Sequence, residues 1–164
     1  MMIRGIHHIA VHVHDLERMT RFYRNAFGFT CFSDPYRWQQ DANFDAAVNL
    51  DNTAGRCCLL RSGNCYMELF EYAQPAPDNR HPKGPNDKGY THFCVDVVGI
   101  EGEMERLRVL GMSFGQPQPV NMGPVKSIYG RDPEGNIIEL QETLEQGFEL
   151  EDLPPLKQKP PRLL

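Results

Sequence analysis

Two histidines and two glutamates have the residue types and the positions to hold a divalent metal ion. His8 and His92 each open a strand-like segment, and Glu68 and Glu139 lie in the strand-like strings YMELFE and IIELQE. Alternation along a strand places His7 on the opposite face from His8, which predicts a structural role for His7. Two imidazoles and two carboxylates suit Zn, Ni, Co, Mn or Fe, with water in the open positions. The sequence therefore predicts one divalent metal ion per site.

The elements that must position these residues occur twice along the chain. Residues 6–13 are rich in aliphatic and β-branched residues and predict a strand. Asp15 is a suitable N-cap for a helix with one apolar face, and Gly28 is a suitable stop. The same order restarts after residues 73–89, which are dense in Pro, Gly, Asn and Asp. The second copy lacks the polar stretch near residues 34–50, whose structure the sequence leaves open.

The repeated order predicts an α+β fold of two tandem βαβββ units. The first unit comprises residues 1–72, a linker follows at 73–89, and the second unit comprises residues 90–142. Residues 143–164 form a Pro-rich tail for which we expect no regular structure. If two units face each other with pseudo-two-fold symmetry, the four candidate metal ligands converge. The linker is long enough for the units to meet within one chain or between chains.

Composition excludes several classes of protein. The formal net charge is −5 and no basic stripe occurs, which argues against a nucleic-acid partner. The sequence contains no run of about 18 apolar residues, so we expect no membrane-spanning helix. The N-terminus lacks the apolar core of a signal peptide, so we expect a cytoplasmic protein. Five cysteines without a CxxC pair are expected to be reduced and mostly buried thiols.

Four further residues are candidates for substrate contacts: His12, Trp38, Tyr129 and Arg131. His12 shares the strand face of His8. Tyr129 and Arg131 share a face on the strand before the predicted turn at residues 132–135, although Arg131 is equally suited to a structural ion pair that holds the turn. Trp38 lies in the polar stretch of the first copy, where a lid or a packing role is expected.

Several strings resemble the vicinal-oxygen-chelate superfamily of glyoxalases, bleomycin-resistance proteins and dioxygenases. IHHIAVHVHDLERMTRFYRNAFGF resembles its opening, and YMELFE, GYTHFCVDV and GRDPEGNIIELQE resemble its later signatures. The resemblance covers about residues 3–142. It implies a half-open barrel of two βαβββ units around a metal site. It also implies the ligands His8, Glu68, His92 and Glu139, and a homodimer with a small-molecule substrate.

The resemblance further implies an enzyme in which the metal binds substrate oxygens and a metal-bound carboxylate acts as base. Glu68 and Glu139 would approach the substrate from opposite sides, which favours epimerisation or isomerisation next to the carbonyl of a small ketone, polyhydroxy ketone or acyl thioester. The string MELFEYAQP is similar to that of methylmalonyl-CoA epimerases, and the ligand set is similar to that of glyoxalase I. A glyoxalase I-type lyase, an extradiol-type dioxygenase and a non-catalytic ligand-binding protein remain alternatives.

Overall fold

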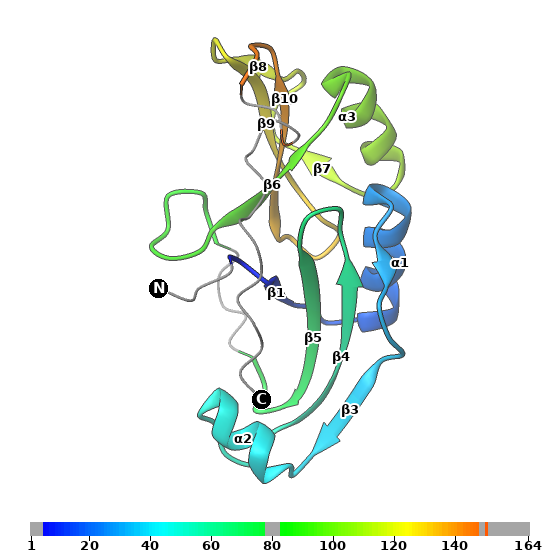
Figure 1. The fold of residues 1–164 in the computed structure, drawn as a ribbon, viewed down its shortest axis with the longest axis vertical. Coiled ribbons are helices and arrows are strands. Elements are labelled where there is room, and N and C mark those ends of the chain that lie inside the picture. The colour runs from blue at the N-terminus through cyan, green and yellow to red at the C-terminus, as the bar shows by residue number, and fades with distance from the viewer. Residues whose placement is uncertain (1–4, 78–82, 148–149, 151–164) are drawn as a thin grey trace, which may run out of the picture.

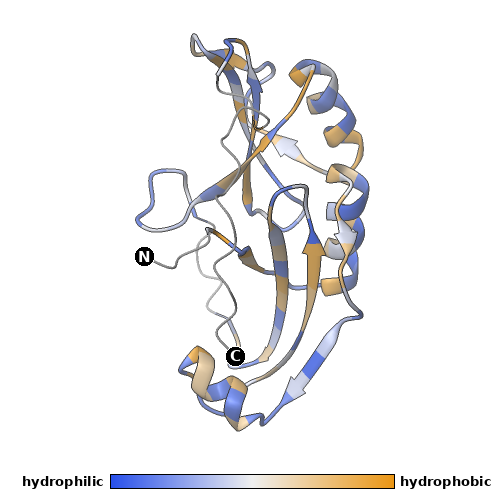
Figure 2. Cartoon of the chain, viewed as in Figure 1, coloured by the Kyte–Doolittle hydropathy of each residue, from blue (hydrophilic) through white to orange (hydrophobic). Residues whose placement is uncertain are grey.

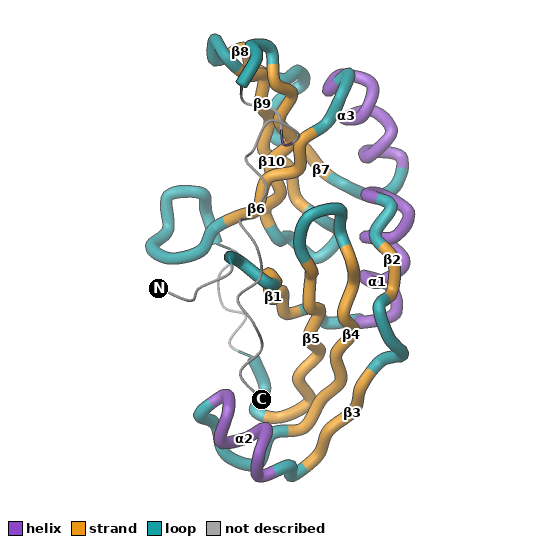
Figure 3. The backbone as a smooth tube through the Cα atoms, viewed as in Figure 1, coloured by secondary structure: helices purple, strands orange, loops and turns teal. Residues whose placement is uncertain are grey.

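The computed structural model describes residues 5–77, 83–147 and 150, and its elements follow the expected duplication (Figure 1, Figure 3). The first unit contains β1 (His8–His12), α1 (Leu16–Phe27), β2 (Thr30–Cys31), β3 (Tyr36–Gln39), α2 (Ala42–Val48), β4 (Ala54–Arg61) and β5 (Tyr66–Gln74). The second contains β6 (His92–Asp96), α3 (Ile100–Val109), β7 (Ser113–Phe114), β8 (Val120–Asn121), β9 (Val125–Arg131) and β10 (Ile137–Thr143). Most of the expected Pro-rich tail and part of the linker lie outside the described residues.

Each unit forms one mixed sheet, and the two sheets have equivalent strand orders. The first runs β1-β5-β4-β2 with β3 also paired to β4, and the second runs β6-β10-β9-β7 with β8 also paired to β9. In each unit the first strand is parallel to the last, so His8 lies beside Tyr66 and His92 lies beside Ile137. The α+β class and the two βαβββ units are confirmed. The two sheets do not close into a barrel (Figure 1).

Helix α1 begins and ends where the capping residues predict. The Asp15 side chain accepts a hydrogen bond from the Arg18 amide at 2.9 Å, and Gly28 adopts φ 68° while its amide donates to the Arg24 carbonyl. The helix buries an apolar face made of Leu16, Met19, Phe22, Tyr23 and Ala26. Among the described residues, no helix has the length and hydrophobicity to cross a bilayer.

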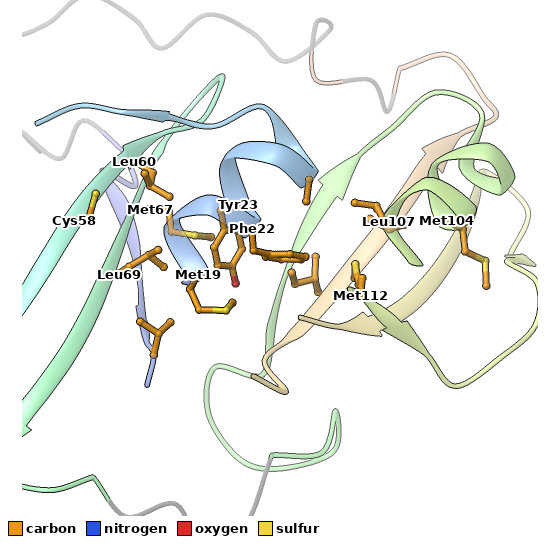
Figure 4. Packing of buried hydrophobic residues seen from close by; sticks show 14 of the residues in the cluster. Met19, Phe22, Tyr23, Cys58, Leu60, Met67, Leu69, Met104, Leu107 and Met112 are labelled. Atoms are coloured by element: carbon orange, nitrogen blue, oxygen red, sulfur yellow. The ribbon is translucent and has the colours of Figure 1, made fainter. Parts of the chain in front are cut away.

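A single hydrophobic core joins the two units. Helices α1 and α3 lie on the same side of the molecule, and buried side chains from both units form one cluster between them and the sheets (Figure 1, Figure 4). The ring of Tyr23 in α1 lies 6.4 Å from that of Phe93 in β6. Polar residues interrupt the apolar ones along β5 (Figure 2), and the strand residues next to the buried Leu69 and Leu140 project to the opposite face.

Hydrogen bonds also tie the second unit to α1 and to the two residues before it. The hydroxyl of Tyr23 donates to the buried carboxylate of Asp132 at 2.8 Å. Burial and this carboxylate hold the pKa of Tyr23 well above its ordinary value, so the phenol remains a donor. Glu134, in the same turn, accepts from the amides of His14 at 2.6 Å and Asp15 at 3.0 Å. The two units are therefore held in a fixed relative orientation.

The polar stretch near residues 34–50 forms β3 and α2. The second unit has no helix that corresponds to α2. Asp41 caps α2 by accepting from the Phe44 amide at 3.1 Å. Asp45, inside α2, accepts from the amides of Asn52 at 2.9 Å and Thr53 at 3.0 Å. These bonds anchor the helix to the start of β4, where it lies at the end of the first sheet (Figure 1).

Candidate metal centre

The first pair of candidate ligands, His8 and Glu68, lies on the sheet face opposite the core. Glu68 in β5 pairs with Ala10 in β1, and Ala10 is the next residue after His8 on the same face of that strand. The small Ala10 side chain leaves space for the two longer ones. Nε2 of His8 is 3.5 Å from Oε2 of Glu68, and their side chains are 43% and 25% exposed. This pair, the first half-site, is therefore open to a ligand.

The second pair, His92 and Glu139, repeats this arrangement in the other sheet. Nε2 of His92 is 3.2 Å from Oε2 of Glu139, with side-chain exposures of 27% and 15%. The hydroxyl of Ser127 in β9 donates a hydrogen bond to Oε1 of Glu139. The hydroxyl of Tyr129 lies 3.4 Å from Nε2 of His92. This pair, the second half-site, is more enclosed by polar side chains than the first.

Both imidazoles are oriented through their other ring nitrogen. Nδ1 of His8 lies 3.0 Å from Nδ1 of His7, and Nδ1 of His92 lies 3.0 Å from the hydroxyl of Thr91. In each half-site this contact leaves Nε2 directed at the carboxylate. Metal-binding histidines are commonly oriented by a hydrogen bond at the other ring nitrogen. The expectation that His7 points away from His8 is wrong. The two rings contact each other, and the His7 ring stacks at 5.0 Å on Tyr66, which pairs with His8 in the β1–β5 register.

The four candidate ligands form two separate pairs within one chain. Over residues 5–77, 83–147 and 150, no three His, Cys, Asp or Glu side chains come close enough together to hold a metal ion. The repeat places each histidine beside a glutamate, and the four candidate ligands do not converge in the described part of the chain.

The structure places Tyr129 against the second half-site, and His12 next to Tyr72 in the first unit. Nε2 of His12 accepts a hydrogen bond from the Tyr72 amide at 3.4 Å, and burial together with the neighbouring His14 lowers the pKa of His12. The Tyr129 ring lies 4.8 Å from that of His92. His12 and His92 both border a cavity of about 530 Å³ between β1 and β6, which is large enough for a small molecule.

Arg131 and Trp38 have structural contacts instead. The Arg131 guanidinium donates to the carbonyls of Gly135 at 2.6 Å and Lys83 at 2.9 Å, so it holds the turn through backbone carbonyls, whereas the structural alternative predicted an ion pair. Trp38 is only 4% exposed, and its Nε1 donates to the Thr53 hydroxyl at 2.9 Å. Trp38 is therefore a packing residue, which leaves little of its surface for a ligand.

Sequence reasoning did not identify two residues of these faces, Ser127 and Tyr72. Ser127 is buried and bonds to Glu139 across the β9–β10 pair. Tyr72 lies on the Glu68 face of β5, two strand steps further along. Alternation along the string YMELFEY could have located Tyr72, whereas Ser127 required the register between two strands.

The cysteines are free, as expected, but most are not buried. Cys58 is buried, Cys31 and Cys94 are exposed, and Cys57 and Cys65 are intermediate. Although Cys94 is exposed as a residue, desolvation of its sulfur by surrounding atoms and the neighbouring Glu139 carboxylate raise the pKa of its thiol to about 12. Without a metal ion nearby, this thiol is therefore protonated at neutral pH.

Comparison with known proteins identifies the family. Residues 5–140 match the model of the Glyoxalase/Bleomycin resistance protein/Dioxygenase superfamily. The chain belongs to this superfamily. The chain is similar in sequence to the 2-epi-5-epi-valiolone epimerase of Actinomyces sp. The two are 31% identical over 146 residues, which cover 83% of this chain and 78% of the epimerase.

Solved structures of the superfamily share the fold. The glyoxalase family protein from Bacillus cereus aligns with a TM-score of 0.76 at 18% identity, covering 87% of this chain and 96% of that protein. The fosfomycin resistance protein FosX from Listeria monocytogenes, solved with Mn(II) and sulfate, aligns with a TM-score of 0.54 at 20% identity, covering 92% and 98%. The superfamily thus includes enzymes and members that bind Mn(II).

Proposed function

We propose that this protein is a metal-dependent epimerase or isomerase that transfers a proton at a carbon next to a carbonyl group. The observation that carries the proposal is the matching pair of half-sites. Each places an imidazole Nε2 beside a carboxylate on an accessible sheet face. Nitrogen and oxygen donors of this kind suit Zn, Ni, Co, Mn or Fe. The donor set therefore fits a divalent metal held by His8, Glu68, His92 and Glu139.

A homodimer would complete each metal site. The half-sites stay apart within the described part of the chain, so each needs a facing half-site from elsewhere. In a two-fold dimer, the first half-site of one protomer faces the second half-site of its partner, and symmetry makes the same contact twice. Two complete sites result, each with one metal ion. The open faces of both sheets would be covered by the same contact.

The two carboxylates would divide the proton transfer between them. A bound divalent ion acts as a Lewis acid that stabilises negative charge on a substrate oxygen. Glu68 and Glu139 come from different half-sites and so flank the substrate from two sides. A carboxylate oxygen of one removes the proton from one face of the carbon, and the other carboxyl returns a proton to the opposite face. The result is inversion at that carbon.

Support for epimerisation comes from the Actinomyces relative, whose name describes this class of reaction. The proposed substrates are a small ketone, a polyhydroxy ketone or an acyl thioester, because each has an acidic hydrogen next to a carbonyl. Turnover by a glyoxalase I-type lyase or an extradiol-type dioxygenase would give different products from the same metal site.

The test combines metal analysis with isotope exchange. We expect elemental analysis to find about one divalent ion per chain, and chelation to abolish activity that the metal restores. In D₂O, NMR should show deuterium entering the carbon next to the carbonyl of a true substrate. Oxygen consumption without exchange would replace the proposal with dioxygenase chemistry. Protein that binds ligand without metal and without turnover would replace it with a binding function.

A further inference from the structure

An aromatic surface continues from the first half-site toward the insert formed by β3 and α2. Residues Glu68, Phe70 and Tyr72 alternate along the same face of β5. Gly55 in β4 lies beside Tyr72, and Trp38 in β3 lies beside Gly55. A Cβ at Gly55 would be 2.7 Å from the Trp38 ring and 2.5 Å from the Glu71 carbonyl. The glycine therefore allows the indole to cover β4 and to approach β5.

The indole of Trp38 supports three rings that remain partly exposed. Its ring meets those of Phe70 at 5.9 Å and Tyr72 at 5.3 Å, both edge-to-face. Phe44 from α2 packs on it at 4.4 Å. Phe44, Phe70 and Tyr72, which we call the aromatic wall, are only half-buried. The hydrogen bonds of Thr53 to Trp38 and Asp45 fix the insert beneath them.

The aromatic wall is continuous with the first half-site. Adjacent same-face residues of a strand are about 7 Å apart, so Phe70 is one step from Glu68 and Tyr72 is two steps away. The Tyr72 ring also meets that of His12 at 5.7 Å, edge-to-face. A substrate whose reacting carbon is at Glu68 would therefore extend its next atoms over the wall.

The second unit has a polar surface at the corresponding positions. Counting from the matching glutamates Glu68 and Glu139, Gln141 takes the place of Phe70 and Thr143 the place of Tyr72. Ser127, which pairs with Gln141 in the β9–β10 register, is buried, and so is the Thr143 hydroxyl, so Gln141 is the polar group that this face presents beside Glu139. When the two half-sites face each other, one side of the pocket is aromatic and the other is polar.

On the basis of the proposed function, we infer that the aromatic wall binds the C–H face of a polyhydroxylated six-membered ring ketone and selects it over open-chain ketones. Such a ring has an apolar face of axial C–H groups, which packs on aromatic rings, and hydroxyls that suit the opposite polar surface. An open-chain ketone of the same polarity offers no flat apolar face. Phe44, Phe70 and Tyr72 are thus specificity-determining residues.

The single tryptophan of the chain provides a direct measurement. Trp38 touches all three wall residues, so its emission should change when a ring covers them. We expect Zn²⁺-loaded protein to give a saturable change with pentahydroxycyclohexanone and a much weaker one with dihydroxyacetone. Phe70→Leu and Phe44→Leu keep apolar bulk but remove the aromatic face, and each should raise the dissociation constant for the ring ketone about ten-fold. Phe70→Tyr should restore it.

Phe32→Leu is the matched control, because Phe32 is an exposed aromatic residue of the same unit outside the wall and the substitution is the same. It should leave binding of the ring ketone unchanged. Equal affinity for both ketones, or Leu variants of the wall that bind the ring as wild type does, would overturn the inference. Metal content and solvent exchange with open-chain substrates would then still support the proposed function. Conversely, wall-dependent binding of the ring by protein that cannot be loaded with metal would support the wall and overturn the proposed function.

Discussion

At the scale of single residues, the two glutamates of the half-sites differ in how firmly they are held. Glu139 accepts a hydrogen bond from the buried Ser127 hydroxyl and lies 3.2 Å from His92. Glu68 approaches its histidine only to 3.5 Å and is more exposed. A carboxylate fixed by a hydroxyl keeps one orientation, whereas a freer one can turn between a metal and a substrate. The half-sites therefore share their His–Glu pair but differ in exposure and in the hydrogen bonds to the carboxylate.

The proposed two-base mechanism predicts different outcomes when each glutamate is changed to glutamine. Glu139→Gln should lower turnover about 100- to 10,000-fold while the amide oxygen still serves the metal, because an amide cannot accept the substrate proton. Glu68→Gln should abolish epimerisation but keep deuterium exchange for one stereoisomer if two bases act on opposite faces. Turnover, metal content and exchange of each isomer are measured separately. Full activity in both variants would contradict a two-base mechanism.

At the scale of elements, a glutamate from the last strand of each unit binds the start of that unit's helix. Glu71 in β5 accepts from the Leu16 amide of α1 at 2.8 Å, and Glu142 in β10 accepts from the Gly99 amide before α3 at 2.5 Å. Both lie three residues after the glutamate of a half-site. A carboxylate there satisfies free amides and interacts favourably with the helix dipole. The strand that carries the ligand is thus fastened to the helix that carries the core.

The bonds of Glu71 predict a pH-dependent contribution to stability. Burial raises its pKa, but hydrogen bonds from Arg56 and the Leu16 amide outweigh burial, so the pKa in the folded protein is lowered. Its stabilising effect is therefore present above the unfolded pKa of about 4.3 and is lost as the pH falls through the folded pKa. Glu71→Gln should lower the free energy of unfolding at pH 7 by about 1 kcal/mol, and the difference should disappear in acid.

Urea unfolding of both proteins between pH 7 and pH 3 measures this effect. Glu142→Gln is a useful companion, since it tests the corresponding contact in the second unit. A difference between wild type and Glu71→Gln that stayed constant down to pH 3 would show that the carboxylate's charge does not contribute.

The sequence predicted the elements better where their signals were local. The α1 boundaries follow from Asp15 and Gly28, and the duplication follows from repeated strings. The insert was not predictable, because α2 depends on Asp45 reaching Thr53 and on Trp38 crossing Gly55. Likewise, the repeat identified the four candidate ligands but not their grouping into two pairs, which depends on strand register and on how whole sheets face one another.

At the scale of the whole molecule, metal sites shared between two protomers would let a mixture of two inactive variants regain activity. His8→Ala and His92→Ala homodimers should each lose metal and activity, because every site lacks one imidazole. A heterodimer of the two variants combines an intact first half-site from one protomer with an intact second half-site from the other. Co-expression with two affinity tags should therefore restore about a quarter of wild-type activity in an unsorted mixture.

Purified heterodimers should contain about half the metal of the wild-type dimer. If each chain built its site alone, mixing would restore nothing, since both chains would still carry a defective site. Co-expressed His8→Ala with wild type is the control for effects of the tags.

The hydrogen bonds that fix the two units in one chain have a consequence for stereochemistry. In an assembly of identical single units, a two-fold axis through the metal would make both walls of the pocket the same, and a substrate could enter in either of two opposite orientations. Fusing two units and tying them through Tyr23 and Asp132 removes that axis from the pocket. Each wall is then free to diverge, as Phe70 and Gln141 have done. A pocket with two different walls would present different side chains to the two faces of one carbon atom, so a substrate would have one preferred orientation in it.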